Sequence, residues 1–404
     1  MDAPLAGLRV LEVANWVAGP SAGVLLADLG ADVVKVEPPS GDAARRMLRQ
    51  PKPDDPALKA VDYPFEQDNR GKRSLVVAID KPEGAAFLAR IAGRFDVFLT
   101  NLVPERQRRF GLDPATMLAA HPRLIHASVS GYGSDGPDAH LPGFDVTAFF
   151  SRGGVYALTA GEDGEPRRLG AAQGDHTTGM VLFSAIMTAL YQRDRTGKGM
   201  AVETSLLRSA LWTLATDLSA ALVDHKPPPR PDRGKFLSPF LNSFRCGDGR
   251  WVQFSMPNSD TNWARFCRAL DRPDLIDDPR FADNRGRYRN QLALLDEVDP
   301  VLDQRPRSEW GERFDAEGLI WAPVNDLADV VEDPHLRATG AFATVEHPAV
   351  GSFETTNVPF TFHGADVGVR GRAPEVGQHT TAVLDELGID ADEQAALRRA
   401  GVFG

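Results

Sequence analysis

The residue with the clearest potential for chemistry is Asp175, in the run Ala171-Ala-Gln-Gly-Asp-His-Thr-Thr-Gly179. Glycine neighbours leave room for a substrate to approach a carboxylate closely, and a carboxylate can act as a nucleophile. The apolar run 180–191 has no charged residue and predicts a helix packed inside the protein. Its positive N-terminal end would lower the pKa of a nearby Asp and keep that side chain ionised. The alternative is that Asp175 only caps the helix.

Basic residues gather in three loops that should lie near strand ends, which suggests a site for an anion. Arg and Lys beside glycine are suited to oxygen-rich anions such as the phosphates of a nucleotide. The alternative is an ordinary solvated surface with scattered charges. The three loops contain Arg45-Arg46, then Arg70-Gly-Lys-Arg73, then Arg106 with Arg108-Arg109.

Several other chemistries lack their motifs. Glu37 ends a predicted strand where an acid often binds a ribose, but Gly19 and Gly23 do not make the Gly-x-Gly-x-x-Gly cradle of a dinucleotide site. The nine histidines show no ligand spacing, so no metal is assigned. Gly-x-Ser-x-Gly is missing, and the two cysteines, Cys246 and Cys267, form no Cys-x-x-Cys pair. His176 adjoins Asp175, but adjacency alone does not make an acid-base pair.

Composition limits the partners. The 404 residues are 42% apolar, enough for two domains of ordinary size or one large domain with an insertion. A net charge of -11 argues against non-specific binding to nucleic acid or an anionic membrane. The N-terminus has no signal-peptide pattern, and the apolar stretches 180–191 and 205–223 are too short or are broken by Arg208 and Asp217. We therefore expect a cytoplasmic protein without a membrane segment.

Short apolar runs alternating with helical ones predict an α/β fold with a parallel sheet, whose ligands collect at the loops after the strands. The expected strands are 8–14, 32–37, 74–79, 97–100 and 124–130, with helices over 21–29 and from Pro82. The charged, proline-rich run 224–235 predicts an exposed linker. After it, a two-strand pattern around 247–255 and helices over 262–270 and 308–317 predict a smaller α+β domain. An extended run 353–362 and helices 380–387 and 390–399 complete the chain.

The order of many short motifs resembles the CaiB/BaiF family, the class III coenzyme A transferases, which also contains α-methylacyl-CoA racemases. Each motif alone is weak evidence of the family, and the specificity comes from the order in which the motifs follow one another along nearly the whole chain. They are Pro4-Leu-Ala-Gly-Leu-Arg-Val-Leu-Glu12, Ala18-Gly-Pro20, Leu26-Ala-Asp-Leu-Gly-Ala-Asp-Val-Val-Lys-Val-Glu37, Gly41-Asp42 with Arg45, Asn69-Arg-Gly-Lys-Arg-Ser74, Asn101, Arg109-Phe-Gly-Leu112, Pro122-Arg-Leu124, Gly131-Tyr-Gly133, Gly136-Pro137, Gly174-Asp175, Thr196-Gly-Lys-Gly199, Asp278-Pro-Arg-Phe281, Ala322-Pro-Val324 and Glu346-His-Pro348.

The resemblance implies a large Rossmann-like domain made of the N- and C-terminal parts, a small inserted α+β domain, and a homodimer whose chains interlock like rings. On this basis 1–223 is the N-terminal part of the large domain, 224–235 the linker and 236–325 the small domain. Residues 326–404 form the return linker and the C-terminal part of the large domain.

The resemblance also implies an activity. In family transferases the Asp matching Asp175 attacks an acyl-CoA thioester, passes through an anhydride and an aspartyl-CoA thioester, and delivers coenzyme A to a carboxylic acid. The acyl-CoA and the acid are substrates, and no cofactor is needed. The implied coenzyme A contacts are Val17, Ala18, Arg45, Lys72, Asn101, Leu102, Arg109, Gly131, Tyr132 and Gly133. Val17 departs from the Gln that several transferases carry there.

One position separates the transferase from the racemase branch of the family. Racemases use a His in a Gly-His-Asp segment together with the Asp, but here the segment is Gly143-Phe-Asp145. Phe144 cannot carry a proton, so a two-base racemisation loses one base. A non-catalytic acyl-CoA-binding protein is the other alternative, and retention of Gly174-Asp175 argues against it. The identity of the acyl donor and of the acid acceptor is left open.

Overall fold

The chain, described in a computed structural model, divides into two compact units. The structure describes residues 2–47, 61–160, 164–227, 233–234, 236 and 238–403. The first unit comprises Met1–His225 and Gly340–Gly404, and the second comprises Lys226–Thr339. The segment 326–339, predicted to return to the large domain, therefore groups with the second unit. Of the predicted linker 224–235, Asp224 still belongs to a helix, and residues 228–232 and 235 lie outside the described residues.

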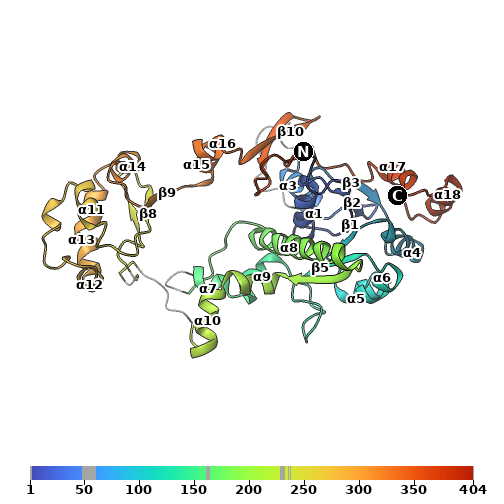
Figure 1. The fold of residues 1–404 in the computed structure, drawn as a ribbon, viewed down its shortest axis with the longest axis horizontal. Helices are drawn as coiled ribbons and strands as arrows, with labels where there is room; N and C mark the ends of the chain where they lie inside the picture. The colour runs from blue at the N-terminus through green and yellow to red at the C-terminus, as the bar shows by residue number, and fades with distance from the viewer. Residues whose placement is uncertain are drawn as a thin grey trace. The chain divides into compact units, whose positions relative to one another are not determined.

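The first unit is built on a six-stranded parallel sheet with the order β3-β2-β1-β4-β5-β6. Strands β1, β2, β3 and β5 of this sheet are labelled in Figure 1. This is the strand order of the Rossmann fold, so the predicted α/β class and parallel sheet are confirmed. The predicted runs 32–37 and 97–100 match β2 and β4 residue for residue. The strands are β1 (Arg9–Val13), β2 (Asp32–Glu37), β3 (Arg73–Val76), β4 (Val97–Thr100), β5 (Ile125–Ser130) and β6 (Met200–Ser205).

Side chains of the sheet alternate between two apolar layers, as the period of two along a strand requires. Val10 faces one buried cluster and its neighbour Leu11 the other. The first cluster joins the sheet to the helices α1 (Ala18–Asp28) and α8 (Gln173–Thr196). The second joins it to α4 (Pro82–Ile91), α6 (Pro114–Ala120) and α17 (Thr380–Glu386). Burial on both faces of the sheet explains why these strands are continuous apolar runs in the sequence.

Helices α1 and α8 pack closely near their N-terminal ends. A Cβ atom added to Gly179 would overlap Ser21 Oγ and would lie 3.0 Å from the carbonyl oxygen of Ala18. Only glycine permits this approach, which places the beginnings of the two helices side by side. The helix expected from Met180 begins seven residues earlier, at Gln173, and only one face of it is buried: Tyr191 is 65% exposed. The predicted helix is present and packs one face into the first apolar cluster.

The rest of the first unit covers the sheet and ends in the C-terminal helices. Its β10–β11 hairpin is antiparallel, and the extended run predicted over 353–362 is a strand only as far as Thr356. The remaining elements are α2 (Ala44–Met47), α3 (Tyr63–Asn69), η2 (Ala92–Arg94), α5 (Pro104–Arg109), η3 (Asp145–Arg152, a π-helix), α7 (Val155–Thr159), α9 (Leu206–Thr213), α10 (Ala215–Asp224), β10 (Phe342–His347), β11 (Gly351–Thr356) and α18 (Ala391–Arg399).

The second unit has its own core of aromatic side chains. Phe254 packs edge-on against Phe244, Phe266 and Phe314 at centroid distances of 5.8, 5.3 and 4.9 Å. Its elements are an antiparallel sheet of β7 (Ser243–Arg245), β8 (Trp251–Phe254) and β9 (Trp321–Val324), with α11 (Trp263–Ala269), η4 (Pro273–Leu275), α12 (Asn284–Arg289), α13 (Gln291–Leu302), α14 (Arg307–Ala316), α15 (Leu327–Glu332) and α16 (Pro334–Ala338).

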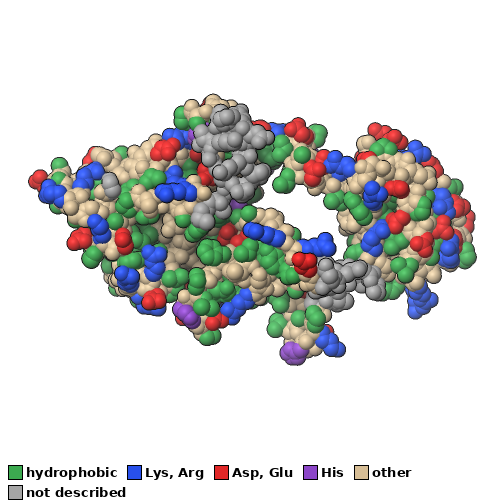
Figure 2. Space-filling model, turned by 180° about the vertical axis from the view of Figure 1, so that it is seen from behind, with side chains coloured by type: hydrophobic (Ala, Val, Ile, Leu, Met, Phe, Trp, Pro, Cys, Tyr) green, Lys and Arg blue, Asp and Glu red, His purple; other side chains and the backbone are tan. Residues whose placement is uncertain are grey.

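Two surface features bear on possible partners. In the described part of the chain, no single helix is long and apolar enough to cross a membrane; α9 and α10 pass that test only as a pair, and they are bent by 85°. On the face drawn in Figure 2, basic and acidic side chains are interspersed rather than gathered by sign.

Candidate active site

A cavity of about 640 Å³ opens at the carboxyl ends of β1, β4 and β5, where parallel sheets bind their ligands. The turn from β1 into α1, the first turn of α8 and the segment before η3 all contribute to its wall. The lining residues are Asn15, Trp16, Val17, Ala18, Asn101, Leu102, Val103, Arg106, Val129, Ser130, Gly131, Pro142, Gly143, Phe144, Asp145, Val146, Arg168, Gly170, Ala171, Ala172, Asp175 and Leu206.

Asp175 lies in the wall of this cavity as the third residue of α8. The sequence suggested that it precedes the helix or caps it, and the structure corrects this: the N-cap is Ala172, in the left-handed conformation with φ 63°. Asp175 is partly exposed, and the residues on either side of it are Gly174 and His176. Its carboxylate is therefore accessible from the cavity while its backbone belongs to a rigid helix.

The electrostatics of Asp175 also differ from expectation. Burial, followed by repulsion from Asp145, raises the pKa of Asp175 to about 7, although His176 opposes the shift. A helix N-terminus is worth about 0.3–1 kcal/mol, less than one pKa unit. Desolvation beside a second carboxylate outweighs that field. The predicted lowering of this pKa was therefore wrong, and the side chain changes its charge near neutral pH.

The second carboxylate is Asp145, a site residue that the sequence reasoning missed. It begins η3 and is buried, and a Cβ atom on Gly174 would overlap its Oδ1. Burial raises the pKa of Asp145, while the amides of Gly174 and Ala172 oppose the shift. Gly174 is thus required for the approach of Asp145 to the first turn of α8. The Gly143-Phe-Asp145 segment is the sequence signal that could have indicated this residue.

His176 pairs with a residue other than Asp175. Its Nε2 lies 2.9 Å from Oδ1 of Asp68, which lies in the last turn of α3. Burial disfavours the charged ring, but the hydrogen bond to Asp68 and the charge of that carboxylate outweigh it and raise the pKa of His176. A positive imidazole next to Asp175 favours the ionised carboxylate. His176 therefore acts on Asp175 through its charge.

Replacing Asp145 with asparagine tests the coupling of the two carboxylates. We expect the pKa of Asp175 to fall because the nearby negative charge is gone. With a pKa near 7, only about a tenth of the Asp175 carboxyl is ionised at pH 6 in the unmutated protein. In Asp145→Asn, the ratio of activity at pH 6 to activity at pH 8 should therefore rise at least about twofold. Asp194→Asn, at the far end of α8, is the matched control. An unchanged pH–rate profile for Asp145→Asn would contradict the coupling.

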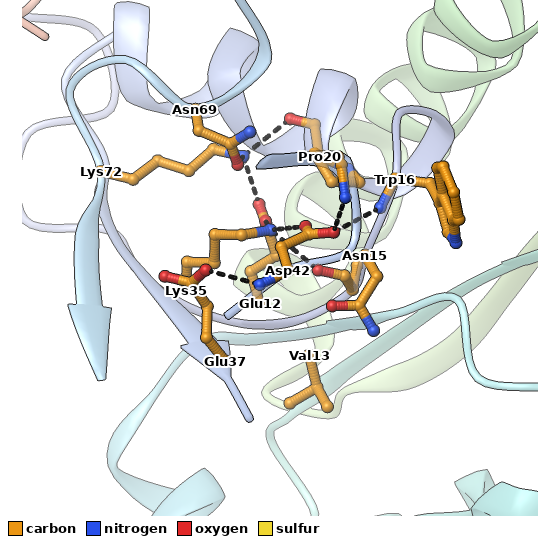
Figure 3. A network of polar contacts seen from close by, with 12 residues as sticks. Glu12, Val13, Asn15, Trp16, Pro20, Lys35, Glu37, Asp42, Asn69 and Lys72 are labelled. Atoms are coloured by element: carbon orange, nitrogen blue, oxygen red, sulfur yellow. Dashed lines mark hydrogen bonds and ion pairs between the residues drawn. The ribbon is translucent and has the colours of Figure 1, made fainter. Parts of the chain in front are cut away.

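Beneath the cavity lies a cluster of buried ion pairs, which we call the ion cluster: Glu12, Lys35, Asp42 and Lys72 (Figure 3). Lys35 Nζ lies 2.8 Å from Asp42 Oδ2 and 3.2 Å from Glu12 Oε1, and Lys72 Nζ lies 2.8 Å from Glu12 Oε2. Burial lowers the pKa of Lys72 to about 8 despite the charge of Glu12. The cluster joins β1 and β2 to the segments that precede α2 and β3.

Arg70 and Lys72, in the basic loop Arg70-Gly-Lys-Arg73 that was predicted to meet a phosphate, point inward. Lys72 Nζ donates to the carbonyl oxygen of Pro20 at 2.9 Å and to Asn69 Oδ1 at 3.2 Å, and its side chain is fully buried. Arg70 is paired with Asp28 at 2.7 Å, also in the interior. Sequence could not show this, because Asp28, Pro20 and Glu12 lie 42 or more residues away from the basic side chains that they bind. Access of Lys72 to a ligand would require the ion cluster to open.

Half of the predicted coenzyme A contacts line the cavity: Val17, Ala18, Asn101, Leu102 and Gly131. The other five are outside that lining among the described residues. Arg45 is bound to Glu37 at 2.7 Å and stacks on Phe65 at 4.0 Å, Lys72 is enclosed as above, Arg109 lies over Phe110, Tyr132 lies under Arg152, and Gly133 donates its amide to Ser130 Oγ at 2.9 Å.

A second hollow, of about 570 Å³, adjoins the first at the ends of β1, β2 and β3. The two hollows share Asn15, Leu102 and Arg106. Glu37 and Lys81 also line the second one. The second hollow has two basic side chains, Lys81 and Arg106, and two acidic ones, Glu37 and Asp80. The two adjoining hollows together offer room for a long ligand that extends from Asp175. In the described part of the chain, no group of three or more His, Cys, Asp or Glu side chains could hold a metal ion.

Comparison with known proteins finds matches over nearly the whole chain. The family model described as CoA-transferase family III matches residues 5–380. A cinnamoyl-CoA:phenyllactate CoA-transferase of Clostridium sporogenes is 30% identical over 97% of this chain and 95% of its own length. A formyl-CoA:oxalate CoA-transferase of Streptomyces coelicolor is 31% identical over 99% of each. The crystal structure of a CAIB/BAIF family protein from Brucella suis superposes with a TM-score of 0.83 and 31% identity, covering 96% of this chain and all of the other.

Proposed function

Because this chain belongs to CoA-transferase family III and is an enzyme of the CoA-transferase type, we propose that it transfers coenzyme A between an acyl-CoA and a carboxylic acid with Asp175 as the nucleophile. The observation that carries the proposal is the placement of a partly exposed carboxylate in the wall of a cavity at the strand ends. A carboxylate suits this reaction because its anhydride is activated enough to exchange with a thiol.

The proposed cycle has four displacements. Ionised Asp175 attacks the thioester carbonyl carbon, forming a mixed anhydride and releasing coenzyme A as the thiolate. The thiolate attacks the aspartyl carbonyl, forming an aspartyl-CoA thioester and releasing the donor acid. The acceptor carboxylate attacks that thioester, giving a second anhydride and the thiolate again. Attack of the thiolate on the acceptor acyl carbon yields the new acyl-CoA and restores the Asp175 carboxylate.

Local geometry supports these steps. A pKa near 7 leaves a substantial part of Asp175 ionised at neutral pH and makes the carboxylate a more basic nucleophile than an ordinary Asp. Helix α1 begins at Ala18 in the cavity wall, with an N-cap, Val17, whose side chain makes no capping hydrogen bond. Its first amides are available to stabilise an oxyanion. Apolar lining residues such as Val129 and Leu206 disfavour water, which would hydrolyse the anhydrides.

We place the acyl end and pantetheine arm of the substrate in the cavity and its nucleotide end in the adjoining hollow. Val17, Ala18, Asn101, Leu102 and Gly131 are the proposed contacts in the cavity. Arg45, Lys72, Arg109, Tyr132 and Gly133 stay proposed contacts through the family resemblance alone. Arg106, shared by the two hollows, is an added candidate for a phosphate contact.

The racemase alternative has weaker support. Phe144, at the position of the racemase His, is 52% exposed and carries no proton-transfer group. His126 is fully buried in β5, with Nε2 3.0 Å from the carbonyl oxygen of Leu112, and lies outside the cavity lining. His140 also lies outside that lining. Among the described residues, the cavity lining therefore holds no histidine that could act as the racemase base.

An interlocked homodimer, with a small inserted domain, stays part of the proposal. The helices α9 and α10 expose Trp212, Leu222 and Val223, which are 77, 75 and 83% exposed in the single chain. Such a group of apolar side chains is typical of a protein-protein interface. Light scattering should give a molar mass of twice 43.9 kDa, and a monomer mass would contradict the dimer.

The function is tested by incubating the protein with a panel of acyl-CoAs, trapping with hydroxylamine and mapping the adduct by mass spectrometry. We expect a hydroxamate on the peptide that contains Asp175, because both proposed intermediates are activated aspartyl derivatives. The panel includes succinyl-CoA, acetyl-CoA and larger acyl-CoAs, because the donor is not known. An unmodified Asp175 together with entry of solvent deuterium at the acyl α-carbon would point to racemisation instead.

A further inference from the structure

Trp16 has an unusual backbone conformation in the cavity wall. Four non-glycine residues of the described chain have φ in the left-handed region, and two of them, Trp16 at 65° and Ala172 at 63°, line the cavity. A bulky side chain rarely adopts this conformation because Cβ crowds the backbone. Residues held in this way cluster at functional sites, where the surrounding structure maintains the conformation.

The ion cluster maintains the conformation of Trp16. Its backbone amide donates to Asp42 Oδ1 at 3.1 Å, and Asp42 is held in turn by Lys35. Lys35 Nζ also donates to the carbonyl oxygen of Ala14 at 2.9 Å. The residue between them, Asn15, exchanges two hydrogen bonds with the Asn101 side chain, at 3.1 and 2.6 Å. Figure 3 shows the indole of Trp16 pointing away from this cluster.

Trp16 meets a second aromatic residue in the cavity wall. Its ring lies edge-on to that of Phe144, with centroids 5.8 Å apart and an interplanar angle of 86°. Phe144 immediately precedes the buried Asp145 that abuts the first turn of α8. We call Trp16 and Phe144 the aromatic wall. With Phe144 half exposed, the wall offers apolar surface close to the helix turn that carries Asp175.

We propose that the aromatic wall contacts the acyl group during transfer and selects aryl or similarly flat apolar acyl groups over acyl groups with a distal carboxylate. This inference rests on the proposed function for the identity of the bound thioester. Aromatic rings prefer edge-to-face or offset contacts, which a rigidly held indole and a neighbouring phenyl ring both offer. A carboxylate against the same surface would lose water without gaining a partner.

Arg168 is the competing determinant, because it also lines the cavity and could pair with a distal carboxylate. It belongs to the exposed segment 164–170, which has no helix or strand. The aromatic wall, in contrast, is tied to the buried ion cluster through Asp42. A rigid contact surface loses less conformational freedom on binding than an exposed loop side chain does. The observations therefore favour the wall as the selecting element.

The test measures binding separately from transfer. In the Asp175→Ala background, isothermal titration calorimetry gives the Kd of 3-phenylpropanoyl-CoA and of succinyl-CoA. We expect 3-phenylpropanoyl-CoA to bind at least about tenfold more tightly. Trp16→Ala should reduce this preference to less than about threefold, while Trp16→Phe keeps most of it. Phe144→Leu, which changes an exposed side chain, provides a second variant for which folding is not at risk.

The controls separate the two proposals. Trp251→Ala, on β8 of the second unit and outside the cavity, should leave the preference unchanged. Equal binding of the two thioesters, tighter binding of succinyl-CoA, or a preference that persists in both Trp16→Ala and Phe144→Leu would overturn the role of the wall. Failure of transfer by the unmutated protein, with the binding preference intact, would instead contradict the proposed function and leave the selection by the wall standing.

Discussion

Replacing Asp175 with alanine is expected to abolish transfer of coenzyme A, with a fall in kcat of at least about a thousandfold. Every proposed intermediate is bonded to this carboxylate, and no other carboxylate in the cavity lining is equally exposed, since Asp145 is buried. Binding of free coenzyme A should change by less than about threefold, because the proposed contacts lie on other elements. Steady-state kinetics and calorimetry measure the two effects.

The pH dependence of the stability of Asp175→Ala provides an independent test of the raised pKa. The pKa of Asp175 is raised from an ordinary value of 3.8 to about 7, so the folded protein binds this proton more tightly than the unfolded chain does. The resulting stabilisation is fully present below pH 3.8 and is lost as the pH rises through about 7. Relative to the unmutated protein, Asp175→Ala should therefore be more stable at pH 8 than at pH 4. Asp194→Ala, on the same helix, should show neither effect. A normal turnover rate in Asp175→Ala would refute its nucleophilic role.

Replacing Lys35 with methionine is expected to cause the largest loss of stability, about 3–5 kcal/mol in the free energy of unfolding. The Lys35 side chain is fully buried and lies 2.8 Å from Asp42 and 3.2 Å from Glu12. Without the ammonium group, Asp42 becomes an uncompensated buried charge, whereas Glu12 keeps Lys72. Denaturant unfolding followed by circular dichroism measures the change.

Two further variants decide whether charge is the cause. Arg90→Met removes an exposed partner of Glu393 in the same unit and should cost less than about 1 kcal/mol. Adding Asp42→Asn to Lys35→Met should restore part of the loss, because the unpaired charge is then absent. If Lys35→Met unfolds at the same denaturant concentration as the unmutated protein, the ion cluster does not stabilise the fold. Because Asp42 also binds the Trp16 amide, Lys35→Met should in addition weaken the preference for aryl acyl groups that is attributed to the aromatic wall.

Much of the fold could be predicted because most strands of the parallel sheet are short apolar runs that can be recognised in the sequence. Val33, Val34 and Val36 in β2, like the apolar run of β4, need burial on both faces, and that requirement is visible in sequence. Strand β6, Met200–Ser205, was not predicted, because its first four positions are exposed or only half-buried, so it lacks a continuous apolar run, and it contains Glu203. The start of α8 was placed too late, since its first turn consists of glycine and polar residues whose helical conformation depends on packing against Asp145 and Phe149.

The sequence by itself determined the fold class, the family and the candidate nucleophile. The fold class and the nucleophile depend on patterns between near neighbours, such as apolar runs and the glycine next to Asp175. The family depends on the order of short motifs along nearly the whole chain. Only the tertiary structure decided the charge properties of the site. Burial, followed by repulsion from Asp145 30 residues away, raises the pKa of Asp175. Glu12 pairs with the buried Lys72, and Asp42 binds the backbone amide of Trp16 in the cavity wall. The reason is physical: pKa values and accessibility depend on burial and on charges a few ångströms distant in space, which chain spacing does not encode.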